Sequence, residues 1–367
     1  MTTTLPHELR SARLTVLAAL AIHLGDLQPA CVAVDAAMAR LRDAHQDVIA
    51  GLVPTAWREA GLAEDPPALD AEDEQPALVL LSACCHPSLP EAARIALMLS
   101  VVAGLPTAEV ARAFAVPDTV MEQRLAWARN RIRPVLGWAI DPDEAEAHLC
   151  RVLDVLLLIF DDGVVHPHTH VDLPTEALEI TRVIVEIFHS SQEPRALLSL
   201  MVLTRARRDA RQGADGALVP LESQDRSRWH RDEIEEGLFL LRSSKRAGRN
   251  GPHQVRAAIQ AEHVTAADTR DTDWERVLAL HDELFQMAPS DAVILARATA
   301  MAAARGPQTA LDTIERLGLD THLYHATRAH LLKMLGRDED ADHAWTAAVS
   351  RVRGAQEHAR LRGEMEH

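Results

Sequence analysis

Apolar side chains recur at helical spacing along most of the chain. Within Arg13–Arg42 this pattern breaks once, at Gly25-Asp26, which predicts two short amphipathic helices. The second helix is expected to turn Val32, Met38 and Leu41 toward a core.

A third short helix is expected to contain Ile49, Leu52 and Trp57. The composition then changes, because Ala63–Pro76 is acidic, contains three prolines and has no apolar period. This composition predicts a linker. Residues 1–76 hold 5 Arg against 12 Asp or Glu, a balance of about −7 (5 − 12).

Helical spacing resumes after the linker. Two helices are expected first, from Leu78 to about His86 and from Glu91 to Val102. A short helix over Thr107–Phe114, a turn at Ala115–Pro117 and a longer helix over Asp118–Arg133 follow, an order typical of a helix-turn-helix. The inward stripe of the longer helix is predicted to be Met121, Leu125, Ala128 and Ile132.

Beyond Pro134 the chain continues as helices separated by loops. Arg297–Leu317 and Arg328–Val349 each read as a helix, a break at Gly306 or Gly336, and a second helix. The two breaks lie about 30 residues apart, near the 34-residue tetratricopeptide period.

Composition supports an all-α fold. Hydrophobic residues make up 47% of the 367 residues but aromatic residues only 3%, so few side chains favour a sheet. The expected domains are 1–62 (N-terminal helices), 63–76 (acidic linker), 77–136 (helix-turn-helix), 137–265 (helical extension) and 266–367 (tetratricopeptide-like repeats). The net charge of −16 opposes nucleic-acid binding over the whole surface, so any DNA contact must be local.

The four cysteines form no disulfide framework, and a reducing cytoplasm fits them best. The N-terminus has no basic signal-peptide region, and no stretch reaches the ~20 apolar residues of a membrane span. We therefore expect a cytoplasmic protein with no membrane partner.

Basic residues concentrate in the helix-turn-helix. A recognition helix offers its N-terminal residues to base edges, and arginines further along meet phosphates. An ordinary helical hairpin with exposed arginines is the alternative at this point. The candidate DNA-binding residues are Arg112, Thr119, Glu122, Gln123, Arg124, Trp127, Arg129 and Arg133.

Several blocks resemble a known family. Ala83–Leu89, Glu91–Leu105, Thr107–Pro117 and Met121–Arg133 resemble the promoter-reading domain of extracytoplasmic-function sigma factors. Further blocks resemble a subgroup with a long C-terminal helical extension: Leu157–Gly163, Leu221–Trp229, Gly251–Ile259 and Asp271–Trp274. The similarity covers about residues 77–355.

The resemblance implies two partners, core RNA polymerase and promoter DNA. In this family an N-terminal domain binds the polymerase clamp and melts the minus-ten element, and the helix-turn-helix reads the minus-thirty-five element. Asp26, Asp35 and Met38 are the candidate polymerase-binding residues. The tetratricopeptide-like extension is expected to bind a regulatory protein or a small ligand.

The chain departs from the family pattern in two places. Pro54–Trp57 resembles the start of the melting helix, but the basic helix that should follow is absent. Residues 54–76 instead hold seven acidic residues and one arginine, which should repel a single strand and make promoter opening poor. In addition, Glu122 would repel phosphates, and Trp127 stands where the family usually has a basic residue.

Other motifs point less clearly to chemistry. His166, His168 and His170 have metal-like spacing, but a polar loop is the favoured interpretation. Cys84 and Cys85 are expected to be buried small apolar residues. Gln224–His230 is either a partner anchor or, as we favour, an internal packing cluster. No catalytic motif is present, so we expect neither an enzyme nor a cofactor.

Three functions remain open from the sequence. The first is a working sigma factor. The second is a sigma-derived regulator that has lost promoter melting. The third is a partner-binding or ligand-binding helical-repeat protein in which the sigma-like domains are a relic.

Overall fold

The computed structural model describes residues 6–43, 47–67, 69, 73–165, 171–211, 213, 219, 221–244 and 251–352. Regular structure in these ranges is entirely helical, with no strand, which confirms the all-α prediction. The chain divides into two compact units, Met1–Met201 and Val202–His367.

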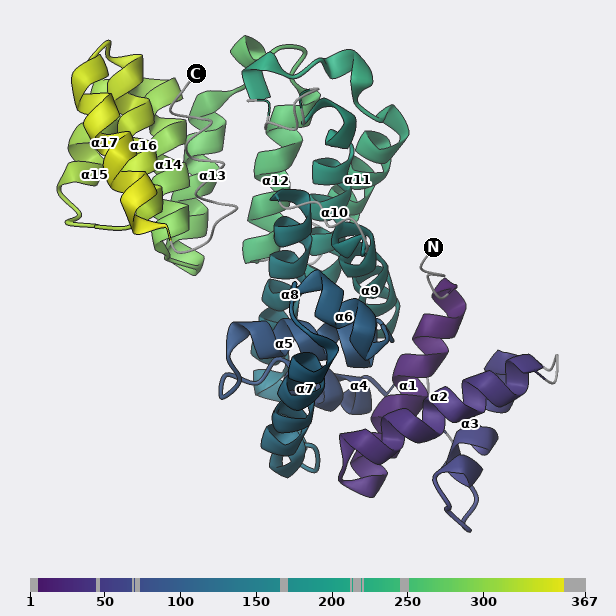
Figure 1. Ribbon diagram of the computed structural model, residues 1–367. Coiled ribbons are helices and arrows are strands. Elements are labelled where there is room, and N and C mark those ends of the chain that lie inside the picture. Colours follow the sequence, from purple (N-terminus) through teal and green to yellow (C-terminus); the bar gives the residue numbers. More distant parts are fainter. Residues whose placement is uncertain are drawn as a thin grey trace. The chain divides into compact units, whose positions relative to one another are not determined.

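The first unit is built around α1 (Figure 1). This helix contacts α2, α3, α4 and α9, and its side chains Leu14, Leu17 and Leu20 are at most 1% exposed. The bounds of the helices in this unit are α1 His7–Leu24, α2 Leu27–Asp43, α3 Val48–Glu59, α4 Gln75–Cys84, α5 Glu91–Leu97, the π-helix η1 Met98–Val102, α6 Thr107–Ala113, α7 Asp118–Ile132, the 3-10 helix η2 Arg133–Val135, α8 Pro142–Val165 and α9 Leu173–Ile187. α10, Glu193–Arg205, crosses into the second unit.

The break between the first two helices lies where the sequence predicts it. Gly25 ends α1 at φ +61°, a left-handed conformation that glycine adopts without steric cost. Met38 and Leu41 are buried on α2, as expected, but Val32 is 57% exposed, so its predicted inward orientation is wrong. Nine residues at about 100° each place Val32 on the face opposite Leu41.

The helix predicted over Glu91–Val102 has two parts. α5 ends at Leu97 and continues as η1, in which the Ala103 amide donates to the Met98 carbonyl at 3.0 Å, five residues back. The buried Arg13 guanidinium donates to the carbonyl of Val101 in the same turn. The wider turn thus lies directly against α1.

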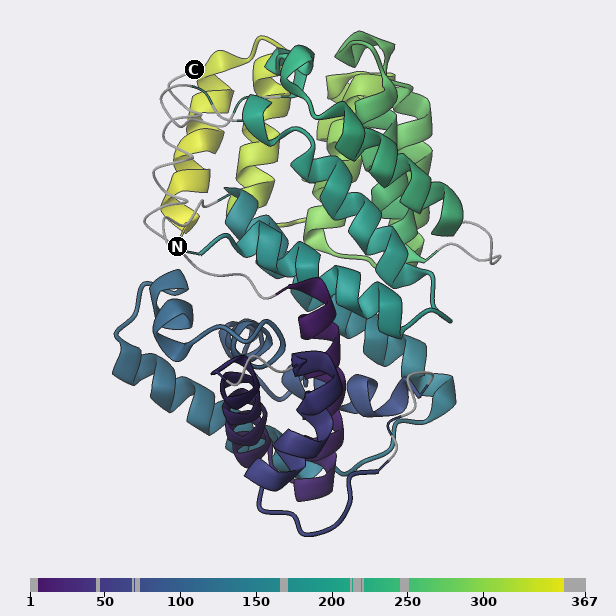
Figure 2. The ribbon, with the colours of Figure 1, turned by 90° about the vertical axis from the view of Figure 1, so that its right-hand side faces the viewer.

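In the second unit the predicted helical hairpins are present. α14 and α15 meet at Gly306, and α16 and α17 meet at Gly336, both glycines with positive φ. α16 and α17 lie side by side, as Figures 1 and 2 show. The α-helices of this unit are α11 Arg231–Ser244, α12 Pro252–Thr265, α13 Trp274–Met287, α14 Asp291–Arg305, α15 Pro307–Glu315, α16 His322–Met334 and α17 Asp338–Arg351.

None of the helices described has both the length and the apolar character needed to cross a bilayer.

Candidate nucleic-acid interface and an adjoining pocket

The turn between α6 and α7 is set by backbone hydrogen bonds. The Val116 amide donates to the Ala111 carbonyl at 3.0 Å, and the Ala115 amide donates to the Arg112 carbonyl at 3.1 Å, the pair that defines a Schellman motif. Ala115 adopts φ +49°, the left-handed conformation that this motif requires. Pro117 then precedes the first residue of α7.

α7 has the inward stripe predicted from its sequence. Met121, Leu125, Ala128 and Ile132 are each at most 1% exposed. The opposite surface carries the side chains that remain free for a partner. Its exposed residues include Thr119, Val120, Glu122, Gln123, Trp127 and Arg131, with Val120 at 42% and Trp127 at 49%.

Charge is unevenly distributed along α7. Its first turns carry Asp118 and Glu122, and its arginines lie further along, which complements the helix dipole. Arg124 places its guanidinium 5.2 Å from the centre of the Phe114 ring, so it is held against the turn. On α6, the candidate residue Arg112 lies 3.8 Å from Glu109 and is 46% exposed.

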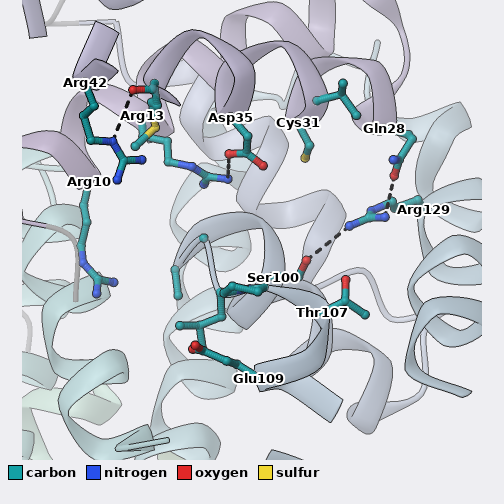
Figure 3. Close-up of a pocket in the computed structure, with 16 residues that line it drawn as sticks. Arg10, Arg13, Gln28, Cys31, Asp35, Arg42, Ser100, Thr107, Glu109 and Arg129 are labelled. Atoms are coloured by element: carbon teal, nitrogen blue, oxygen red, sulfur yellow. Dashed lines mark hydrogen bonds and ion pairs between the residues drawn. The ribbon is translucent and has the colours of Figure 1, made fainter. Parts of the chain in front are cut away.

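The other two candidate phosphate contacts, Arg129 and Arg133, bond side chains at or just before the start of α2. Arg129 donates to the side-chain oxygen of Gln28 at 2.5 Å and to the Ser100 hydroxyl at 3.3 Å, as Figure 3 shows. Arg133 forms an ion pair with Asp26. The role of these arginines in DNA binding remains a prediction.

The candidate polymerase-binding residues lie on or directly before α2. Asp26 accepts a hydrogen bond from the Gln28 amide at 3.0 Å and also pairs with Arg133. Asp35 pairs with Arg13 at 3.1 Å and has a 61% exposed side chain, whereas Met38 is 2% exposed. Of the three, Asp35 is the most accessible to a partner, and the assignment remains a prediction.

A cavity of about 660 Å³ lies beside these residues in the first unit. Its walls come from α1, α2, η1, the connection to α6, the start of α6, and Arg129 of α7 (Figure 3). Sequence reasoning missed this pocket. The available signal was a pair of arginines three residues apart in an apolar helix, Arg10 and Arg13. Arginines are rarely buried unless they are paired.

The remaining motifs do not form sites among the described residues. Cys84 and Cys85 are at most 1% exposed, which confirms the packing interpretation, and burial raises the pKa of Cys85 to about 12. The candidate metal ligands His166, His168 and His170 lie outside the described residues. No group of three or more metal-ligand side chains occurs in the described part of the chain.

The Gln224–His230 segment packs against the second unit through Trp229 and Arg226, whereas Asp225, Ser227 and Arg228 are exposed. Trp229 is 5% exposed, and the Arg226 and Arg207 guanidiniums lie 4.3 and 5.8 Å from its ring centre. Arg226 also donates to the carbonyls of His263 and Ala266 at 3.1 and 2.7 Å. These contacts confirm a packing cluster rather than an exposed partner anchor.

Comparison with known proteins fits the helix-turn-helix geometry. Residues 83–132 match sigma-70 region 4, and residues 148–245 match a family of unknown function, DUF6596. An uncharacterized protein of Rhizobium meliloti (strain 1021), R00370, is 36% identical over 299 residues, covering 79% of this chain and 71% of the relative. The chain belongs to the family of this Rhizobium protein. No solved structure matches.

The region 4 match spans α5, η1, α6 and all of α7, including the turn and the buried stripe. It therefore identifies the helix-turn-helix as sigma-like, and the protein as a sigma-factor-like one. A region 4 domain of this kind is typical of DNA-binding proteins of transcription.

Proposed function

We propose that this protein is a member of the extracytoplasmic-function sigma group that directs or regulates transcription initiation. Its helix-turn-helix, residues 77–136, reads promoter DNA, and residues 1–62 contact core RNA polymerase. The observation that carries this proposal is α7 itself, whose buried stripe leaves Thr119, Glu122 and Gln123 exposed just after the turn. Those positions are the ones that a recognition helix presents to base edges.

A sequence-specific binding assay tests the DNA-reading role. Gln123→Ala should lose about 1–3 kcal/mol at one base position, because a base-edge hydrogen bond is removed. Arg131→Gln should weaken binding to all sequences alike and lower the salt slope by about 1, because an exposed cation late in α7 meets phosphate. The assay is fluorescence anisotropy on a set of single-base promoter variants at several salt concentrations.

Uniform losses from both substitutions would argue against base readout. Arg276→Gln, on α13 of the second unit, is the matched control and should change neither measurement. Pull-down of core polymerase by the full chain, compared with Asp35→Ala, tests polymerase binding separately.

A second candidate is a sigma-derived regulator that does not open promoters. Trp57, the aromatic residue expected at the start of a melting helix, is 1% exposed and lies 5.6 Å from the His23 ring. α3 ends at Glu59, and the acidic segment follows. Trapping unstacked bases requires accessible aromatic and basic side chains, so these observations favour loss of melting.

Permanganate footprinting of a linear promoter separates the two candidates. The regulator should leave thymines around the start site unreactive when bound with core polymerase, because no stacking surface offsets the cost of strand separation, about 1.4 kcal/mol per base-pair step. Clear opening by the unaided holoenzyme would support the working sigma factor.

The hairpins of residues 266–367 are proposed to form tetratricopeptide-like repeats that bind a regulatory partner. Stacked helical hairpins present extended surfaces suited to such partners. Deleting residues 266–367 should change DNA or polymerase affinity while residues 77–136 stay folded. Unchanged affinity would leave the repeats without this role.

A further inference from the structure

We propose that the pocket of the first unit binds a small molecule that carries at least two negative charges, through Arg129 and Arg42. The cavity volume of about 660 Å³ lies within the range of small-molecule sites, roughly 300–1,000 Å³. The proposal concerns this pocket alone and does not depend on DNA binding.

The charge in the pocket wall is unbalanced. Four arginines and two carboxylates line it: Arg10, Arg13, Arg42, Arg129, Asp35 and Glu109. Arg13 and Asp35 neutralise each other as an ion pair. Arg10 is neutralised by Glu176, at 2.8 Å. Glu109 forms an ion pair with Arg112 at 3.8 Å.

The two remaining cations have neutral partners. Arg129 donates to an amide oxygen and a hydroxyl, and its Nε is buried with no hydrogen-bond partner among the described residues. Arg42 donates to the backbone carbonyl of Met38 at 3.3 Å. Neither has a carboxylate of the described residues as its partner, so an anion in the cavity would supply the missing charge.

The two cations mark different parts of the cavity. Arg129 is bonded to Gln28 near the start of α2, and Arg42 lies fourteen residues further along the same helix, about 21 Å in axial rise. Figure 3 accordingly shows them toward opposite ends, with the Arg13–Asp35 pair on the wall. This spacing suits a molecule with anionic groups at separate positions.

The rest of the wall restricts what can bind. Val32, Met38, Leu105 and Pro106 supply apolar surface, which fits a carbon skeleton. The Glu109 carboxylate comes from α6 and disfavours an anion on that side. The expected ligand class is therefore an organic molecule with phosphate or carboxylate groups held along α2.

Isothermal titration of the full chain with a straight-chain dicarboxylate, sebacate, tests the proposal, and inorganic pyrophosphate, whose two phosphates lie too close together to reach both cations, is the comparison. Sebacate should bind saturably, one per chain. Arg129→Gln should weaken that binding by at least about tenfold, because a charge-assisted hydrogen bond is lost. Arg42→Gln should weaken it several-fold, and Arg129→Lys, which keeps the charge, less than Arg129→Gln.

Arg40→Gln is the matched control, because Arg40 lies on α2, is 66% exposed and is outside the pocket wall. It makes the same change in net charge and should alter the affinity less than twofold. Circular dichroism of each variant checks folding. The proposal is overturned if sebacate does not bind more tightly than about 1 mM, or if folded Arg129→Gln and Arg42→Gln bind it as the parent does. Pyrophosphate that binds as tightly as sebacate would contradict a site formed by two separated cations.

Discussion

Each unit contains a group of arginine side chains, and the surroundings of the two groups are opposite in kind. In the second unit Arg207 and Arg226 lie against the buried Trp229 ring, and Arg226 is bonded to two backbone carbonyls. In the first unit Arg42 and Arg129 line an open cavity. An arginine cluster filled by its own neighbours contributes to stability, whereas one that faces empty volume is available to a ligand.

The largest expected effect is at Trp229. Trp229→Ala should lower the unfolding free energy of the second unit by about 3–5 kcal/mol, because it leaves a cavity and removes the ring beside two guanidiniums. Urea denaturation monitored by hydrogen–deuterium exchange of peptides from each unit measures this. Phe239→Ala, at a side chain 63% exposed, should change it by less than about 0.5 kcal/mol. Equal effects of the two substitutions would contradict the closed-cluster description.

The next largest effect is expected on the pH dependence of stability of the second unit. Burial lowers the pKa of His281, in the second unit, from its ordinary value of 6.5 to about 4, so the folded state resists protonation. The unfolded state takes up the proton first as the pH falls, so stability is lost from about pH 6.5 down to about pH 4. His281 alone should account for about 2 kcal/mol between pH 7 and pH 5.

His281→Gln should remove that part of the pH dependence. Unfolding by urea at pH 7 and at pH 5 gives the comparison, and His343→Gln, at an exposed position of α17, is the control. A pH dependence that His281→Gln leaves unchanged would show that this histidine is protonated in the folded state.

The smallest effect is expected at the pocket. Arg42→Gln should change the unfolding free energy of the first unit by less than about 0.5 kcal/mol, because its side chain is exposed and has no carboxylate partner among the described residues. Thermal unfolding in phosphate-free buffer measures it. A loss as large as that of Trp229→Ala would make the pocket a structural cluster like the one in the second unit.

Local patterns predicted the fold well and the pocket poorly. The buried stripe of α7 follows from the helical period of its own residues. The break between α1 and α2 follows from the presence of Gly25. The exposure of Val32 could not be predicted in this way, because the apolar character of the residue does not say which face of α2 packs against α1. The partners of Arg10, Arg129 and Arg133 lie 166, 101 and 107 residues away, beyond any local spacing rule.

The turn of η1 was missed for a related reason. A π-turn differs from an α-turn by one residue, and the apolar run through Met98–Val102 fits both. The contact that marks this turn, the Arg13 guanidinium on the Val101 carbonyl, is tertiary and joins residues 88 positions apart. The buried and exposed faces of α7, by contrast, were predictable because both lie in one short helical segment, while the DNA-reading role of the exposed residues remains a prediction.

The bonds from Arg129 to Gln28 and from Arg133 to Asp26 have a cost for any DNA complex that uses these arginines. Such a complex can form only with molecules in which Arg129 has left Gln28 and Arg133 has left Asp26. If the two contacts together favour the closed arrangement by about 1 kcal/mol, only about one molecule in six is competent, and the apparent Kd rises about sixfold. Asp26 bonds the Gln28 amide through its other carboxylate oxygen, so α2 keeps that contact when Arg133 leaves. Release of Arg133 thus leaves this contact of α2 in place, and a molecule that binds near α2 is expected to change the affinity of any DNA complex that uses these arginines.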